Sequence, residues 1–136
     1  MQAKHKILIA EDDSGIRLII RTRLEAAGYV VQTARNGLEA VDYVQSFRPD
    51  GMVLDINMPE LDGFGMLERL QKLPQFRTPT LVLTARHAAD DVRRAVRLGA
   101  KDYLTKPFSE AQLMARVARL LRPPPAAVPA ANAVVL

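Results

Sequence analysis

Short, continuous apolar runs alternate with stretches of helical periodicity along most of this chain. Residues 6–10 (KILIA) form one such run, and the apolar residues that follow recur every three or four positions as far as Gly28. A continuous apolar run is typical of a strand buried on both faces, and the longer spacing is typical of a helix that buries one side. The pair of segments occurs five times, which predicts a parallel α/β sheet covered by helices on both faces.

The predicted elements are bounded by residues that end helices or favour turns. The strands are expected at residues 6–10, 29–34, 51–55, 79–85 and 102–105. A glycine or proline follows each of the five predicted helices: Gly28, Pro49, Pro74, Gly99 and Pro123. Because crossovers between parallel strands are right-handed, few topologies remain open to such a chain.

The chain has 136 residues, enough for one domain with its own core, and we expect residues 1–122 to form it. Residues 123–136 (PPPAAVPAANAVVL) are uncharged and rich in Pro and Ala, which predicts a linker or tail. The sequence contains no cysteine, so disulfides, thiolate zinc sites and cysteine nucleophiles are excluded. No apolar run reaches the ~20 residues that a membrane span needs, and residues 6–10 are too short for a signal peptide. We therefore expect a cytoplasmic location and no membrane contact.

The net charge of +4 is unevenly distributed. Residues 1–85 carry ten Lys/Arg and eleven Asp/Glu, whereas residues 86–136 carry nine and four. This excess suits an acidic partner or nucleic acid, or is simply the solvated side of helices. Only 5% of residues are aromatic, which argues against stacking on single-stranded nucleic acid. Fourteen residues after the last predicted helix are too few for a helix-turn-helix module, so we expect no direct nucleic-acid binding by this chain.

Acidic residues follow two of the predicted strands. The first strand ends at Glu11-Asp12-Asp13 and the third ends at Asp55. The carboxyl ends of parallel strands share one edge of the sheet, where open α/β sheets bind their ligands. If these two strands are neighbours, Asp12, Asp13 and Asp55 converge there and repel one another unless a cation intervenes. Hard carboxylate oxygens suit Mg²⁺, or Mn²⁺, better than zinc.

Two further residues are expected at the same edge. Thr84 would add a hydroxyl and Lys106 a mobile positive charge, which with a metal ion and a carboxylate nucleophile form a set suited to a phosphoryl group. Taken singly, each residue has a simpler explanation: Asp12 and Asp13 as a helix N-cap, Asp55 as a loop residue, Thr84 as a structural residue and Lys106 as a solvated lysine. Their combination favours the phosphoryl site.

The chain resembles the receiver domain of two-component response regulators over residues 5–121. The matching stretches are ILIAEDD (7–13), GYVVQTARNGLEA (28–40), PDGMVLDINMPELDG (49–63), LTA (83–85) and GAKDYLTKPF (99–108). Their order and spacing fit that family throughout. The resemblance implies a flavodoxin-like (βα)5 three-layer sandwich, with a parallel five-stranded sheet of order 2-1-3-4-5.

The resemblance also implies how the site works. Asp55 would accept a phosphoryl group from the phosphohistidine of a sensor histidine kinase or phosphotransfer protein. Asp12 and Asp13 would hold Mg²⁺ together with Asp55 and the backbone carbonyl of Asn57. The ion would neutralise oxygens of the transferred group. The chain would then assist its own phosphotransfer and slow autodephosphorylation without turning over a separate substrate.

Other residues would bind the phosphoryl group and transmit its presence. Lys106 would pair with one phosphoryl oxygen and Thr84 would donate a hydrogen bond to another. Tyr103 would be an aromatic switch whose rotamer follows Thr84. The Lys106–Pro107 peptide bond would be cis. Gly63 would remove a Cβ where the chain must turn after the phosphoacceptor.

The family's output face consists of its fourth helix, fifth strand and fifth helix, which correspond here to residues 87–122. This region carries most of the excess positive charge, at Arg93, Arg94, Arg97, Lys101, Arg116, Arg119 and Arg122. Phosphorylation of Asp55 would remodel the face and cause homodimerisation, or docking to a downstream effector protein or fused output domain. Arg86 would lie near the path of the hydrolytic water and change the lifetime of the aspartyl phosphate.

Two other functions share part of this residue set. A phosphatase of the haloacid dehalogenase type also uses a strand-end Asp with Mg²⁺, but it needs Asp-x-Asp, and here the triplet is Asp55-Ile56-Asn57. A degenerate receiver would serve as a constitutive docking module, but the complete set of site residues argues against it. The prediction is therefore a phosphorylation-activated switch in a two-component phosphorelay.

Overall fold

The computed structural model describes residues 4–85 and 89–122. Within them, five strands alternate with five helices, as the apolar pattern predicts. In chain order they are β1 (Lys6–Ala10), α1 (Ser14–Ala26), β2 (Val30–Ala34), α2 (Gly37–Ser46), β3 (Gly51–Asp55), α3 (Gly63–Gln71), β4 (Thr80–Ala85), α4 (Ala89–Arg97), β5 (Asp102–Lys106) and α5 (Glu110–Leu121).

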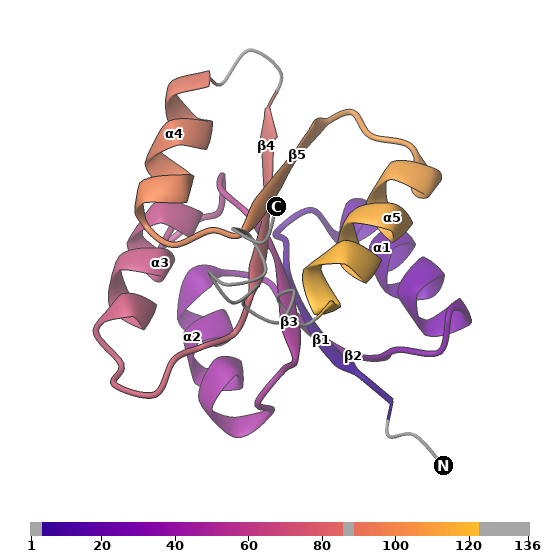
Figure 1. The fold of residues 1–136 in the computed structure, drawn as a ribbon, viewed down its shortest axis with the longest axis horizontal. Coiled ribbons are helices and arrows are strands. Elements are labelled where there is room, and N and C mark those ends of the chain that lie inside the picture. Colours follow the sequence, from indigo (N-terminus) through magenta and orange to yellow (C-terminus); the bar gives the residue numbers. More distant parts are fainter. Residues whose placement is uncertain (1–3, 86–88, 123–136) are drawn as a thin grey trace, which may run out of the picture.

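The five strands form one parallel sheet of order β2-β1-β3-β4-β5. Helices α1 and α5 pack on one face, and α2, α3 and α4 on the other, which gives three layers (Figure 1). The predicted flavodoxin-like sandwich is therefore confirmed. The strand order places β1 and β3 side by side at the centre, with their crossovers leading to opposite sides of the sheet.

Each face of the sheet has its own hydrophobic core. Along β1, Ile7 and Ile9 join the core beneath α1 and α5, whereas Leu8 and Ala10 join the core beneath α2, α3 and α4. All four side chains are fully buried. Burial on both faces explains why the strands are continuous apolar runs rather than alternating ones.

The helix boundaries follow from capping residues. Four helices begin after a residue whose side chain accepts a hydrogen bond from a backbone N–H three positions on: Asp13, Asn36, Asp62 and Ser109. Gly28 and Gly99 have positive φ angles of 98° and 102° after α1 and α4, the conformation that glycine adopts most easily at the end of a helix.

Two predictions concern residues outside the described part of the chain. They are the Pro/Ala tail at 123–136 and the role of Arg86, so the division into 1–122 and 123–136 stays a prediction. Among the described helices, none combines the length and the apolar character needed to cross a membrane.

Candidate functional site

The site lies at the carboxyl ends of β1 and β3, where the two crossovers diverge. Ala10 pairs with Leu54, so the next residue on each strand, Glu11 and Asp55, meet at this edge. The Glu11 N–H donates to the carbonyl of Ala34 at 3.0 Å, which continues the ladder toward β2 for one residue. Both acidic side chains are thus positioned by sheet backbone.

Three carboxylates converge here. Oxygens of Glu11, Asp12 and Asp55 all lie within 4.8 Å of one another. Glu11 is 0% exposed and Asp55 is 3% exposed, whereas Asp12 faces solvent. Like charges at this separation repel strongly where water is excluded, and a divalent cation with oxygen ligands relieves that repulsion.

The structure does not bring Asp13 into this cluster. Its Oδ1 instead accepts a hydrogen bond from the N–H of Ile16 at 2.9 Å, which makes Asp13 the N-cap of α1. The two carboxylates that the structure places beside Asp55 are therefore Glu11 and Asp12, and not the predicted Asp12 and Asp13. Matching the ends of the predicted strands would place Ala10 opposite Asp55, so only the register in the structure, with Ala10 opposite Leu54, brings Glu11 to this position.

Lys106 supplies a positive charge to the carboxylates. It ends β5, and its side chain reaches past the end of β4, so that Nζ lies 2.9 Å from Oε1 of Glu11 and 3.3 Å from Oδ1 of Asp55. The lysine side chain is 26% exposed and the two carboxylates are almost fully buried. The Lys106–Pro107 peptide bond is cis, as the resemblance implies.

The pKa values of Glu11 and Lys106 are both raised by their surroundings. Burial raises the pKa of Glu11 above its usual range, and Asp55 acts in the same direction, while Lys106 opposes both. Burial alone would lower the pKa of Lys106, but Glu11 and Asp55 outweigh it and the pKa is raised. Lys106 is therefore a cation at neutral pH, and one cation does not balance three carboxylates.

Thr84 lies on the neighbouring strand at the same edge. Asp55 pairs with Leu83, so Thr84 is one residue further along β4. The residue is 1% exposed, and its Oγ1 has no hydrogen-bond partner within residues 4–85 and 89–122. A buried hydroxyl without a partner is unfavourable, and it is available to donate to a ligand.

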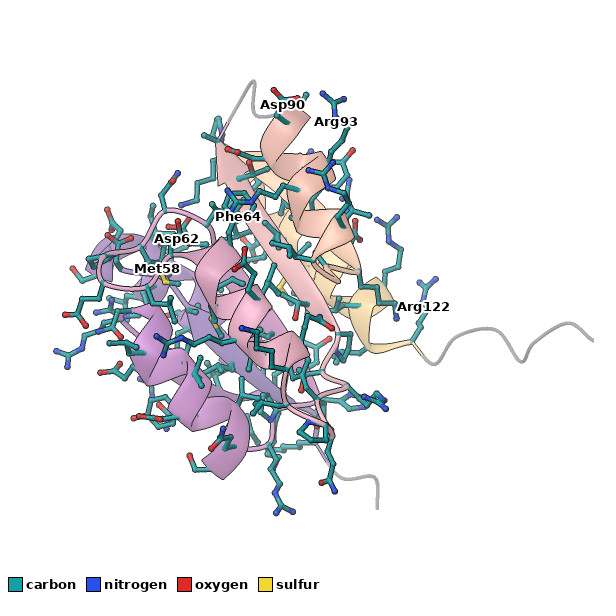
Figure 2. The ribbon with its side chains drawn as sticks, turned by 90° about the vertical axis from the view of Figure 1, so that its left-hand side faces the viewer. Met58, Asp62, Phe64, Asp90, Arg93 and Arg122 are labelled. Carbon is teal, nitrogen blue, oxygen red and sulfur yellow. The ribbon has the colours of Figure 1, made fainter. Side chains whose placement is uncertain are left out.

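The loop after Asp55 is held close to β3. The Asn57 N–H donates to Oδ1 of Asp55 at 3.3 Å. A Cβ on Gly63 would lie 2.7 Å from Cα of Ile56 and 2.9 Å from the carbonyl oxygen of Asp55. Gly63 is the first residue of α3 and its φ is not positive, so it permits close approach of a helix rather than the predicted turn. Figure 2 labels two residues of this loop, Met58 and Asp62, beside the start of α3.

Tyr103 lies on the edge strand β5 and is 41% exposed. Its backbone carbonyl accepts a hydrogen bond from Nη1 of Arg116. Val96 on α4 is also exposed, at 53%. Both are large apolar side chains on the predicted output face.

Several of the basic side chains predicted on this face form ion pairs or hydrogen bonds within the molecule. Arg116 Nη1 lies 3.2 Å from Oδ1 of Asp102, and Arg119 Nε donates to Oδ2 of the same carboxylate at 3.0 Å. Lys101 Nζ donates to the carbonyl of Leu120 at 3.1 Å. The surface over β5 and α5 is therefore less basic toward a partner than its composition suggests.

On α4, Arg93 and Arg94 are also paired. The Arg94 guanidinium lies 4.2 Å from the centre of the Phe64 ring and 3.6 Å from Glu68, so it joins α4 to α3. Arg93 pairs with Asp90 one turn earlier (Figure 2). Arg122 lies at the end of α5, far from this pair in the same view.

Comparison with known proteins identifies the family. Residues 7–118 match the response regulator receiver domain. Response regulator MprA of Mycobacterium avium (strain 104) is 42% identical over 117 residues, which is 86% of this chain and 51% of that protein. The chemotaxis response regulator CheY4 of Vibrio cholerae is 32% identical with a TM-score of 0.82, over 88% of this chain and 100% of that one.

A second similar structure contains a metal ion. The receiver domain of sensor histidine kinase PA1611 of Pseudomonas aeruginosa PAO1, solved with magnesium coordinated in its active-site cleft, is 30% identical with a TM-score of 0.80. The alignment covers 88% of this chain and 98% of that one.

The chain spans about half the length of the curated relatives it matches. Receiver domains bind Mg²⁺ at an acidic pocket and interact with histidine kinases and output effectors; they are signalling switches rather than enzymes that turn over a separate substrate. The family match, the sheet order and the three carboxylates at the switch point agree. This chain belongs to the receiver domains of two-component response regulators, which are switches activated by phosphorylation.

Proposed function

We propose that Asp55 is the phosphoacceptor of this switch and takes its phosphoryl group from a phosphohistidine. A carboxylate oxygen of Asp55 attacks the phosphorus, the phosphorus–nitrogen bond breaks, and the imidazole nitrogen leaves with the electron pair. The observation that carries the proposal is the convergence of Asp55 with Glu11, Asp12 and Lys106 at one edge of the sheet. Burial of Asp55 keeps bulk water from competing with the donor.

The donor set fits Mg²⁺. Glu11, Asp12 and Asp55 offer carboxylate oxygens within 4.8 Å of one another, and the Asn57 carbonyl is the expected fourth protein ligand. Oxygen-only ligands with a solvent-facing side, here at Asp12, suit an ion that keeps several waters. The bound ion would supply positive charge to the phosphoryl oxygens. Mn²⁺ shares this ligand preference.

Lys106 and Thr84 hold the product. Without the phosphoryl group the Lys106 ammonium is shared between Glu11 and Asp55. The phosphoryl oxygens add negative charge beyond Asp55 and attract the same ammonium. The buried Oγ1 of Thr84 then gains an acceptor, so the side chain has a reason to change position only in the phosphorylated protein.

The signal leaves through the face made by α4, β5 and α5. Thr84 pairs with Thr105 on β5, two residues from Tyr103, so a shift of the threonine acts on the strand that carries the exposed tyrosine. We propose that this rearrangement exposes a surface for a downstream effector protein, a fused output domain or a second copy of the chain. Slow autodephosphorylation returns the switch to its resting state.

The phosphoryl donor is proposed to be a sensor histidine kinase or a phosphotransfer protein in the cytoplasm. Leu18 and Ile19 on α1 are 63% and 60% exposed, although both are large apolar side chains. They lie in the second turn of α1, whose N-cap, Asp13, directly follows the acidic residues of the site. A partner that covers them can bring its phosphohistidine to Asp55.

The proposal is tested by intact mass after incubation with acetyl phosphate and MgCl₂. We expect one phosphoryl group on the wild type and none on Asp55→Asn. Asp42→Asn, on the exposed side of α2, is the matched control and keeps the modification. Continuous release of phosphate from phosphate esters would instead indicate a phosphatase and overturn the proposal.

A further inference from the structure

Arg17 is the one arginine of α1 that contacts the loop carrying two of the three carboxylates. Its Nη1 donates to the backbone carbonyl of Glu11 at 2.9 Å and to that of Asp12 at 3.2 Å. The other two arginines of the helix make side-chain ion pairs instead, Arg21 with Glu25 and Arg23 with Glu110. Arg17 is half-buried, and its guanidinium binds backbone carbonyls rather than a surface carboxylate.

These two hydrogen bonds act where the sheet no longer holds the chain. The paired residues of β1 end at Ala10, and the Glu11 N–H makes the last backbone bond to β2, with Ala34. The two carbonyls that follow lie between strand and helix. One guanidinium nitrogen shared between them fixes the two peptide planes relative to α1, and the direction of each side chain follows from its peptide plane.

We propose that Arg17 is a positioning residue for the divalent cation: it holds the Glu11 and Asp12 backbone so that both carboxylates face Asp55. The inference rests on the proposed function, since it concerns the same metal site. The direction of the change in Mg²⁺ affinity when Arg17 is lost distinguishes a positioning role from an effect of its charge. A positive charge near a cation site opposes cation binding by Coulomb's law, so loss of Arg17 would tighten binding if charge were its main effect. A positioning role predicts weaker binding.

The test measures Mg²⁺ affinity of the whole chain by calorimetry and by the amide shifts of the loop. Arg17→Ala is expected to bind Mg²⁺ about tenfold more weakly, the lower end of the range for residues that orient metal ligands. Arg17→Lys recovers part of the affinity because an ammonium can donate to one carbonyl at a time. Arg21→Ala removes a positive charge from the same helix and should bind Mg²⁺ like the wild type.

Phosphorylation by acetyl phosphate gives a second readout. In Arg17→Ala the Mg²⁺ concentration for half-maximal rate should rise about tenfold, while the rate at saturating Mg²⁺ stays within about twofold, because only ligand geometry is lost. A purely structural role would lower the unfolding midpoint in EDTA and leave the Mg²⁺ dependence unchanged. If Arg17→Ala does not fold, Arg17→Lys carries the comparison.

The possible outcomes separate this inference from the proposed function. Equal or tighter Mg²⁺ binding by Arg17→Ala, or equal weakening in Arg21→Ala, overturns the positioning role and leaves the phosphoacceptor proposal standing. A wild type that neither binds Mg²⁺ nor accepts a phosphoryl group overturns both.

Discussion

Lys106 and Glu11 lie 95 residues apart in the sequence and form an ion pair of 2.9 Å at the edge of the sheet. The contact from the same ammonium to Asp55 is longer, at 3.3 Å. Glu11 therefore holds the lysine beside Asp55, the proposed phosphoacceptor, in the unphosphorylated protein. The lysine balances part of the negative charge in the unphosphorylated protein. Removal of its side chain should therefore affect both stability and phosphorylation.

Lys106→Ala should lower both stability and phosphorylation. Two nearly buried carboxylates lose their cation, and since the lysine is partly exposed we expect a loss of about 1–2 kcal/mol, below the 3–5 kcal/mol of a fully buried pair. Urea unfolding in EDTA measures the first effect and acetyl phosphate labelling the second. Lys72→Ala, at an exposed lysine of the α3 end, is the control. Equal values for both variants would contradict the role of Lys106.

Gly63→Ala should displace the loop that follows Asp55. The added methyl would meet backbone atoms of Ile56 and Asp55, which cannot rotate away, so we expect a cost of about 1–3 kcal/mol and slower phosphorylation. Gly65→Ala is a matched control two residues later in α3. There the nearest atom is Cδ1 of the flexible Leu61 side chain, and alanine favours helix, so stability should stay equal or rise. Thermal unfolding of the two variants compares them, and a milder effect at Gly63 than at Gly65 would argue against this explanation.

Thr84→Val should separate folding from switching. The valine keeps the shape and removes a buried hydroxyl without a partner in the described residues, so stability should be unchanged or up to about 1 kcal/mol higher. Thr80→Val on the same strand removes a hydroxyl that donates to the Thr78 carbonyl at 3.2 Å and should destabilise. Amide shifts caused by a phosphoryl mimic in α4 and β5 should shrink in Thr84→Val. Wild-type shift changes in that variant would show that the threonine does not transmit the signal.

Leu18→Ser with Ile19→Ser should impair transfer from a kinase and not from a small donor. Loss of two exposed apolar contacts should slow transfer from a phosphorylated kinase core about tenfold, which corresponds to about 1.4 kcal/mol of binding. The rate of labelling by acetyl phosphate should stay within about twofold of the wild-type rate, which corresponds to about 0.4 kcal/mol in activation free energy. Val30→Ser, an exposed apolar residue at the opposite end of the sheet, is the control. Equal loss with both donors would place the defect in the site itself.

Glu39 should contribute stability that depends on pH. Its carboxylate accepts the backbone N–H of Arg35 at 2.9 Å, and this bond, with the Arg35 guanidinium at 3.2 Å, lowers its pKa from the usual value of 4.5. The unfolded chain then binds the proton more tightly, so the contribution is present above pH 4.5 and is lost as pH falls through the lower folded value. Urea unfolding of Glu39→Gln at pH 7 and at pH 3 measures it. A difference from wild type that is as large at pH 3 as at pH 7 would refute the assignment.

The fold was predictable because its determinants are local. Buried parallel strands leave continuous apolar runs, and glycines such as Gly28 and Gly99 mark helix ends by their positive φ. The strand order came from the family resemblance, since apolar runs do not record which strand lies beside which. The meeting of Asp55, Thr84 and Lys106 at one edge followed from strand polarity alone.

The parts that could not be predicted depend on register and on distant partners. Asp12 and Asp13 look alike in sequence, but the pairing of Ala10 with Leu54 brings Glu11 to the site, and the start of α1 uses Asp13 as a cap. Likewise, the excess of basic residues near the C-terminus did not indicate that Asp102 on β5 forms ion pairs with two arginines of α5.

The central claim concerns the chemical identity of the phosphorylated residue, and reductive mapping tests it most directly. The protein is phosphorylated with acetyl phosphate and Mg²⁺ and then treated with borohydride, which reduces an acyl phosphate to an alcohol, and its peptides are sequenced by mass spectrometry. We expect reduction at position 55 alone, and at no position when EDTA replaces Mg²⁺. Reduction at Glu11 or Asp12, or labelling at 55 that persists in EDTA, would contradict the account.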